Sequence, residues 1–369
     1  MDIRTSATRA IIPLLVLLGA AADGRSQQNA PPSAVPPREG DYIVKDFKFS
    51  DGQTLPEVKL HYTTLGTPQR DVSGRTTNAV VILHGTNRRG GVFLVPSFAG
   101  ALFNQGQLLD TSKYYVILPD QLAAGAGKST KPSDGLRAKF PKYDYSDMVK
   151  AMQILLKDGL QVNHLKLFIG VSMGCMEGFM WAESNPDDMD GLLLLSCLPT
   201  EIAGRNRMVR KLMIDDVKND PGWNDGNYTQ QPYGLRAALG HLLVVGSVPT
   251  LWQKEYPTAA AADKYVDQYI EDNMKSTDAN DFIYQYGASR NYNPQKDLGK
   301  IKAKLLLINS QEDFWNPVEL GIAEQEIKKV KQGRLVQLPF GDLNRGHYTF
   351  FQAAFWQKHL AEFLEELKH

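Results

Sequence analysis

The sequence predicts an α/β fold with a mostly parallel central sheet flanked by helices and an inserted helical segment. Short apolar runs alternate with helical patterns along the chain, which is typical of a mainly parallel sheet. A glycine-rich turn at residues 170–174 joins one such run directly to a helical pattern. Across residues 199–297 the apolar runs stop, and Pro, Gly, Asn and Asp separate short helical pieces instead.

The length and composition are typical of a globular protein with a large buried core. The chain has 369 residues, of which 43% are hydrophobic, and this supplies ample material for a buried core. Lys plus Arg and Asp plus Glu both total 41, so the balanced charge argues against nucleic acid as a partner. Residues 125–130 resemble the end of a phosphate-binding loop, but Leu122 stands where its first glycine would be. We predict no metal and no cofactor.

The amino-terminal residues read as a targeting segment. Arg4 and Arg9 precede an apolar run and an alanine-rich stretch, so residues 1–22 predict a secretory signal peptide. The run is too short to span a bilayer, and we expect no membrane span in the mature chain. Residues 23–40 are rich in Pro, Gln, Ser and Ala and predict a flexible leader. No cysteine follows the run, so we expect a secreted or periplasmic protein without an acylated cysteine.

The remaining elements follow in order. The first part of the core, residues 41–198, contains a predicted helix at 146–157 and predicted strands at 43–49, 57–65, 79–83, 114–118, 165–169 and 191–195. Residues 199–297 predict a helical cap inserted over the sheet. The second part of the core, residues 298–369, contains predicted strands at 303–309 and 334–338 and a closing helix at 349–367.

The turn at residues 170–174 fits the G-x-S-x-G pattern of a nucleophile elbow, with Ser172 at its centre. A strand that turns sharply into a helix holds the turn residue in a strained conformation, and flanking glycines remove the Cβ atoms that would clash. The serine oxygen then stands clear of the backbone near a helix N-terminus. The apolar run before it and the helical pattern after it favour Ser172 as a nucleophile.

A serine hydroxyl needs a base, and the base needs an acid that fixes its tautomer. On this kind of scaffold the chain order is serine, acid, histidine. Of the seven histidines, His347 follows the last predicted strand and begins the last helix, so it is the predicted base. His164, by contrast, precedes the elbow strand and belongs at the opposite edge of the sheet. Glu312 and Asp313 both follow the strand at 303–309, and we favour Asp313 as the acid.

Two backbone N–H groups should stabilise a developing oxyanion. Met173 N–H, directly after the serine, is one, and Thr86 N–H in the loop after residues 79–83 is the other. Arg88 and Arg89 continue that loop. The basic pair either meets a carboxylate on the substrate or is a solvated surface pair, and the sequence does not decide between these.

The chain has two cysteines, Cys175 just after the elbow and Cys197 at the end of the next predicted strand. Both should lie near the same edge of the sheet. An exported protein could bridge them. We favour two buried thiols over a disulfide.

These motifs together resemble the α/β-hydrolase superfamily and, within it, the homoserine O-acetyltransferase lineage. The similarity covers nearly all of the mature chain. It is carried in the core by residues 83–85, 125–129, 140–141, 170–176, 181–182 and 346–347, and in the cap by Arg210 and residues 219–223, 226–228 and 234–235. The resemblance implies an α/β-hydrolase fold in which Ser172 is the nucleophile, Asp313 the acid and His347 the base.

The chain also departs from that lineage on the substrate side. Tyr348 stands where the acetyltransferases usually have Asp, Cys175 where they have Gly, and Leu239 where they have Arg. These differences argue against homoserine as the acceptor. We expect Arg88, Arg210, Tyr228 and Tyr348 to line the substrate side.

The leading hypothesis is an exported serine hydrolase that acts on a small-molecule ester through an acyl-serine. An O-acyltransferase is the second hypothesis, because an acyl-serine can be attacked by an alcohol as well as by water. A ligand-binding protein that keeps the fold without turnover is the third. The sequence leaves open the acyl group, the alcohol and the assembly, with a homodimer as one option.

Overall fold

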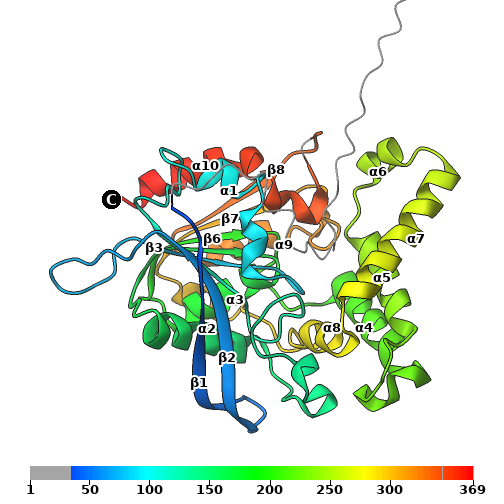
Figure 1. Cartoon of the computed structure of the whole chain (residues 1–369). Coiled ribbons are helices and arrows are strands. Elements are labelled where there is room, and N and C mark those ends of the chain that lie inside the picture. The colour runs from blue at the N-terminus through cyan, green and yellow to red at the C-terminus, as the bar shows by residue number, and fades with distance from the viewer. Residues whose placement is uncertain (1–34, 343, 369) are drawn as a thin grey trace, which may run out of the picture.

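The computed structural model describes residues 35–342 and 344–368, so the predicted signal peptide (residues 1–22) and most of the predicted leader lie outside the described residues. One eight-stranded sheet forms the centre of the molecule, with the order β1-β2-β4-β3-β5-β6-β7-β8 (Figure 1). The pairs β1–β2 and β2–β4 are antiparallel. All other neighbours are parallel, as the alternating pattern predicts.

The strands lie close to the predicted runs. They are β1 (Arg38–Lys48), β2 (Thr54–Leu65), β3 (Ala79–Leu83), β4 (Tyr115–Pro119), β5 (Leu165–Val171), β6 (Met189–Leu195), β7 (Lys304–Ser310) and β8 (Gly333–Leu338). The start of β1 corrects the leader boundary, because residues 38–40 belong to the sheet rather than to a flexible segment. They are ordered by antiparallel pairing, with Arg38 opposite Thr64 and Gly40 opposite Tyr62.

The helices flank the sheet and fill the connections. They are α1 (Ala99–Leu102), α2 (Tyr145–Ile154), α3 (Met173–Ser184), α4 (Gly204–Lys218), α5 (Gly234–Val245), α6 (Pro249–Glu255), α7 (Ala259–Ser276), α8 (Ala279–Gly287), α9 (Ile322–Glu326) and α10 (Ala353–Glu366). The predicted closing helix at 349–367 is in fact two elements, a 3-10 helix η10 (Gly346–Phe351) and α10. Gln352 separates them with non-helical angles, φ −94° and ψ 70°.

Alternate residues of each strand pack into different layers. In β3, Val81 and Leu83 belong to the hydrophobic cluster that includes residues of α2 and α3. Val80 and Ile82 belong to the cluster that includes residues of α1 and α10. Because side chains on a strand point to opposite faces in turn, a strand covered on both faces reads as one continuous apolar run.

Residues 196–303 contain helices and loops but no strand. Helices α4 to α8 lie together to one side of the sheet (Figure 1). They share their own hydrophobic cluster, which includes Met213, Leu235 and Phe282 and also takes in Trp315 from beyond β7. Among the described residues no single helix is both long and apolar enough to cross a membrane. Helices α5 and α6, which meet at an angle of 105°, reach the necessary length and apolar composition only when taken together.

Candidate active site

Ser172 occupies the turn between β5 and α3 in a conformation that the flanking glycines make accessible. Its φ of 52° and ψ of −110° lie outside the regions that side chains favour. A Cβ on Gly174 would lie 2.5 Å from the carbonyl oxygen of Leu83, and one on Gly170 would overlap the carbonyl oxygen of Gly174. Only glycine fits both positions, so the two residues allow the sharp turn that the pattern predicts.

Three segments that are distant in sequence meet at the carboxyl edge of the sheet. His347 Nε2 lies 2.8 Å from Ser172 Oγ. His347 Nδ1 lies 2.9 Å from Asp313 Oδ2. Ser172 follows β5, Asp313 follows β7, and His347 lies in η10 after β8. The hydroxyl, imidazole and carboxylate therefore form one hydrogen-bonded row. In that row the serine is half-buried and the other two residues are buried.

The Asp313 carboxylate is held by more than the histidine. Its Oδ1 accepts hydrogen bonds from the backbone N–H groups of Trp315 (2.8 Å) and Asn316 (3.2 Å). Asn316 Nδ2 donates to Asp313 Oδ2 at 2.8 Å and to Ser196 O at 3.0 Å. Asn316 thus ties the carboxylate to the end of β6. Sequence reasoning missed this residue, although an amide side chain three positions after the acid is a usable signal.

The loop that carries His347 is organised by Asn344. Asn344 Oδ1 accepts from Gly346 N–H (2.9 Å), Ser310 Oγ (2.7 Å) and Thr349 Oγ (2.6 Å). Gly346 has a left-handed φ of 56°, which glycine adopts at low cost. The hydrogen bond from Ser310 connects this loop to the end of β7. The segment that carries Asp313 also leaves the end of β7, so the acid and the base are held by the same strand end. Asn344 was not among the predicted site residues.

The residues predicted to supply the two N–H groups of an oxyanion hole are Met173, which directly follows Ser172, and Thr86, which directly follows Gly85. Met173 is the first residue of α3, and within the described part of the chain its N–H has no hydrogen-bond acceptor. The same holds for the N–H of Thr86. The preceding residue, Gly85, packs directly on the serine, because a Cβ there would lie 3.1 Å from Ser172 Cβ. Both groups are therefore free to donate to a ligand.

Three of the four predicted substrate-side residues lie around the histidine. The Arg88 guanidinium carbon lies 6.0 Å from the centre of the Tyr348 ring, and the Tyr348 ring centre lies 5.6 Å from that of His347. On another side, the Arg210 guanidinium carbon lies 5.4 Å from the Trp315 ring centre. The Trp315 ring centre in turn lies 6.1 Å from that of His347. Each arginine is thus one aromatic ring away from the histidine.

Arg210 is unusual because it is buried without a carboxylate. It is 4% exposed and is the only buried lysine or arginine among the described residues. Its Nε donates to Asn206 Oδ1 (2.8 Å) and its guanidinium donates to Ser289 Oγ (3.2 Å). None of the ion pairs within residues 35–342 and 344–368 includes it. Buried charges are normally paired, so this cation has capacity for an anionic ligand.

The structure does not bring Tyr228 to the histidine. Its hydroxyl accepts a hydrogen bond from Asn280 N–H at 3.1 Å, and Arg137 stacks over its ring at 5.4 Å. It belongs to the hydrophobic cluster of the cap. These contacts indicate a role in holding α8 against the rest of the cap. The resemblance in sequence there marks packing rather than proximity to the serine.

The prediction of two free thiols was wrong, because Cys175 and Cys197 form a disulfide with their Cα atoms 6.0 Å apart. Cys175 lies in the first turn of α3 and Cys197 lies two residues beyond β6. Since β5 and β6 are parallel neighbours, the segments that leave them come together at one edge. The bond joins the helix that follows the serine to the end of the adjacent strand.

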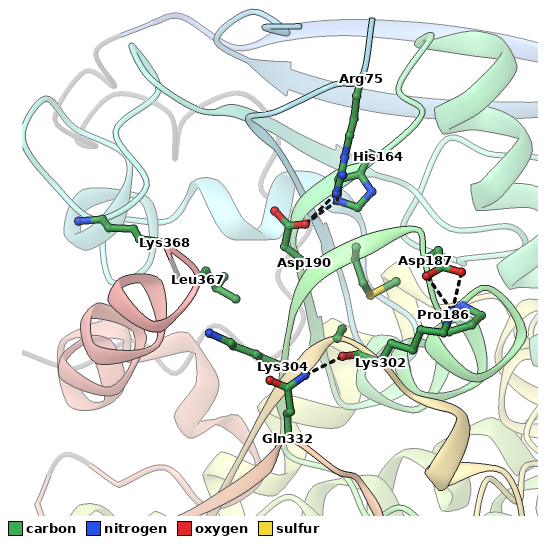
Figure 2. A pocket seen from close by; sticks show the side chains of 12 residues that line it. Arg75, His164, Pro186, Asp187, Asp190, Lys302, Lys304, Gln332, Leu367 and Lys368 are labelled. Atoms are coloured by element: carbon green, nitrogen blue, oxygen red, sulfur yellow. Dashed lines mark hydrogen bonds and ion pairs between the residues drawn. The ribbon is translucent and has the colours of Figure 1, made fainter. Parts of the chain in front are cut away.

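A cavity of about 580 Å³ lies at the other edge of the sheet, away from the serine (Figure 2). His164 at the start of β5 lines it, so the seven residues of that strand, about 23 Å in length, separate it from Ser172. Five of its charged or titratable residues pair with one another. Arg75 and His164 both contact Asp190, at 3.0 and 2.8 Å, and Lys302 pairs with Asp187 at 2.9 Å. This cavity is therefore separate from the hydrogen-bonded row.

Known proteins show the same architecture. A family model described as alpha/beta hydrolase fold matches residues 78–354. A homoserine O-acetyltransferase of Geobacter sulfurreducens is 29% identical over 269 residues, covering 65% of this chain and 71% of that protein. A probable acyltransferase of Methanothermobacter thermautotrophicus is 26% identical over 280 residues, covering 76% and 84%. The crystal structure of esterase E22 superposes with a TM-score of 0.77 at 20% identity, covering 89% and 100%.

The sheet topology, the serine turn between two glycines and the matched family model all indicate an α/β-hydrolase fold. The match spans most of the described chain and includes the turn at Ser172 and the loop of His347. The chain belongs to the α/β-hydrolase family, and its sequence is similar to the homoserine O-acetyltransferases within it.

Proposed function

We propose that this chain is a serine hydrolase that cleaves small or medium-sized carboxylic esters through an acyl-serine intermediate. A chain of this family with these relatives is an enzyme, either a hydrolase or an acyltransferase. The observation that carries the finer proposal is the position of His347, whose two ring nitrogens contact Ser172 and Asp313. That arrangement is what nucleophilic catalysis by a serine requires.

The proposed reaction has two halves. Ser172 Oγ attacks the ester carbonyl carbon while His347 Nε2 takes the hydroxyl proton, and Asp313 holds the Nδ1–H side of the ring. The N–H groups of Met173 and Thr86 stabilise the tetrahedral oxyanion. The intermediate collapses, and the alcohol leaves with the proton from His347. Water then attacks the acyl-serine with His347 again as base, which releases the carboxylic acid and restores the serine.

Acyl transfer is the second candidate, and the names of the similar proteins favour it. The first half of the reaction is the same, and the outcome depends on whether water or an alcohol attacks the acyl-serine. The replacement of the usual Asp by Tyr348 and of the usual Arg by Leu239 argues against homoserine as that alcohol. Release of p-nitrophenol from p-nitrophenyl acetate, measured alone and with homoserine, separates the two. Consumption of acetyl-CoA only when an alcohol is present would contradict the hydrolase.

The two arginines near His347 suggest that the substrate carries negative charge. Arg210 is buried without an anionic partner, and Arg88 stacks on Tyr348 beside the histidine. A carboxylate on the substrate would supply the missing counter-charge. We therefore propose Arg88, Arg210 and Tyr348 as substrate-binding residues. Tyr228 is left out of this set, because its contacts lie in the cap.

Export is part of the proposal. It rests on the charged and apolar pattern of residues 1–22. The Cys175–Cys197 disulfide supports it, because such bonds persist in oxidising compartments. Mass spectrometry of the protein recovered from the medium or the periplasm tests this. A mature chain beginning near residue 23 is expected, and an intact protein confined to the reducing cytosol would contradict it.

The direct test of the reaction compares purified wild type with Ser172→Ala on p-nitrophenyl esters of increasing acyl length. We expect turnover by wild type and its loss in the variant. Folding of the variant is checked by circular dichroism. A correctly folded wild type that binds esters without turnover would favour the third hypothesis, a ligand-binding homologue.

A further inference from the structure

The segment that supplies the Thr86 N–H, here called the oxyanion loop (residues 85–88), is fixed at its start by the core. The carbonyl oxygen of His84 accepts from Gly174 N–H at 3.2 Å and from Gln121 Nε2 at 2.6 Å. Both donors belong to the core, because Gly174 lies in the first turn of α3 and Gln121 follows β4. The start of the loop is therefore held by groups of the core.

The end of the same loop is fixed by the cap. Asn87 N–H donates to Oε1 of Gln285, which lies in α8 and is fully buried. Asn87 has a left-handed φ of 55°, a conformation that needs external support in most residues. Its Oδ1 packs on Gly125, where a Cβ would overlap it. Asn87 is thus held between the cap and a second loop of the core.

Helix α8, which carries Gln285, is held in position by contacts with both the core and the cap. Asp281 accepts from Ser133 N–H at 2.8 Å and from Ser133 Oγ at 2.6 Å, and Tyr284 OH donates to the carbonyl oxygen of Phe140 at 3.0 Å. On its other face, Phe282 packs into the hydrophobic cluster of the cap. The helix joins cap and core, so the amide of Gln285 has a defined position.

We propose that Gln285 is a positioning residue that sets the oxyanion loop from the cap. The proposal rests on the proposed function, since it assigns the loop its role as an oxyanion donor. The hydrogen bond fixes the peptide between residues 86 and 87. That peptide directly follows the one that carries the Thr86 N–H, so fixing it limits how far the Thr86 N–H can turn from the serine. Within the described residues Gln285 Nε2 has no partner, so the Asn87 N–H is the group that orients the side chain. The oxyanion hole is then complete only when the cap is packed on the core, because α8 of the cap supplies the acceptor for Asn87 N–H.

The test compares one substitution at two glutamines of the cap. Gln285→Met keeps the length of the side chain and removes the acceptor. Gln231→Met is the control, because Gln231 Oε1 also accepts from a backbone N–H, that of Ala279 at 2.9 Å, which begins α8 and is not in the oxyanion loop. Gln231 Nε2 also donates to Asp278 Oδ2 at 3.1 Å. Gln285→Glu keeps an oxygen that can accept the same hydrogen bond, and it serves as the rescue variant.

Two measurements apply to all variants. The first is ester kinetics together with the inhibition constant of a trifluoromethyl ketone, which mimics the tetrahedral intermediate. We expect Gln285→Met to lower kcat and ketone affinity by roughly 10- to 100-fold with KM changed by less than about 3-fold. Gln231→Met and Gln285→Glu should stay near wild type. Equal losses in Gln285→Met and Gln231→Met, or a loss confined to KM, would overturn the proposal.

The second measurement does not depend on turnover. Hydrogen exchange in a peptide covering residues 84–89 should speed up in Gln285→Met and not in Gln231→Met. Unchanged exchange in Gln285→Met would also overturn the proposal. If exchange is faster in Gln285→Met but wild type shows no ester turnover, the proposed function fails while the anchoring of the loop stands.

Discussion

The two edges of the central sheet each carry a histidine–aspartate pair, and of these two pairs only the one at the carboxyl edge contacts a serine hydroxyl. At the carboxyl edge His347 Nδ1 lies 2.9 Å from Asp313, and its Nε2 lies 2.8 Å from Ser172. At the amino edge His164 Nε2 lies 2.8 Å from Asp190. By distance alone the two pairs are equivalent, so distance alone does not identify a catalytic histidine.

The surroundings of the two pairs differ. Asp190 also contacts Arg75 and Lys166, and 34% of its side chain is exposed. The Asp313 side chain is fully buried, and its other partners are neutral N–H donors. At the amino edge the carboxylate is the centre of a surface ion-pair network. At the carboxyl edge it serves one imidazole, which leaves the second nitrogen for a hydroxyl.

The largest expected difference comes from the two histidines. We expect His347→Gln to lower kcat/KM for ester hydrolysis by roughly 10⁴- to 10⁶-fold, because the serine loses its base. His164→Gln is the control and should stay within about 2-fold, since it acts on the surface network only. The measurement is kcat/KM of both variants for the same ester. Similar losses in both variants would mean that stability, not chemistry, is being measured.

The two aspartates give the next largest difference. Asp313→Asn keeps the shape of the side chain but no longer favours the tautomer that accepts the serine proton, so kcat should fall by about 10³- to 10⁴-fold. Asp190→Asn should leave kcat unchanged. Thermal unfolding of both variants provides the control for folding. Retention of most activity in Asp313→Asn would favour Glu312, the other candidate acid, in its place.

The two arginines test the proposed substrate charge. Arg210 has no carboxylate partner, whereas Arg75 is paired with Asp190 at 3.0 Å. Arg210→Met should lower kcat/KM for the mono-p-nitrophenyl ester of succinic acid by about 10- to 100-fold, the loss of one charge-assisted hydrogen bond. The neutral butyrate ester should change little, and Arg75→Met should affect neither ester. A wild type that prefers the butyrate ester would contradict an anionic substrate.

The smallest expected effects concern the free energy of unfolding. Two carboxyl groups, Asp190 and Glu177, should change it in opposite directions as the pH rises. Burial opposes ionisation of Asp190, but hydrogen bonds from His164 and Lys166 lower its pKa to about 2. Its stabilisation is therefore present above pH 4 and is lost as the pH falls towards 2. Because the group is partly exposed, we expect Asp190→Asn to cost about 1 kcal/mol at pH 7. Chemical unfolding at pH 7 and pH 3 should show this cost shrink.

Glu177 in α3 supplies the opposite case. Burial raises the pKa of this carboxyl well above its usual value, and within the described residues neither of its oxygens has a partner. The folded protein keeps its proton while the unfolded chain loses it, so this group destabilises the fold as the pH rises. Glu177→Gln should raise the free energy of unfolding by up to about 1.4 kcal/mol per pH unit above pH 5. A pH-independent difference would contradict a neutral Glu177.

Local patterns and topology were enough to predict most of the fold and the central row. The serine turn is a local pattern, and the carboxyl ends of parallel strands share one edge, so Ser172, Asp313 and His347 could be brought together from their positions alone. Alternating apolar runs similarly gave the strands within a few residues.

What the sequence did not predict depends on tertiary contacts. The start of β1 depends on pairing with β2, and the disulfide on how α3 leaves β5 beside the end of β6. Asn316 and Gln285 are polar residues whose role appears only when the backbone groups they bind are placed. Tyr228 shows the reverse, since its resemblance to the family reflects the packing of the cap.

The central claim is that His347 and Asp313 activate Ser172. Its most direct measurement is the rate of covalent labelling by a fluorophosphonate, with the modified peptide identified by mass spectrometry. We expect wild type to be labelled on Ser172 alone, His164→Gln to react at the wild-type rate, and His347→Gln to react at least about 100-fold more slowly. Labelling of another serine, or an unchanged rate in His347→Gln, would contradict the account.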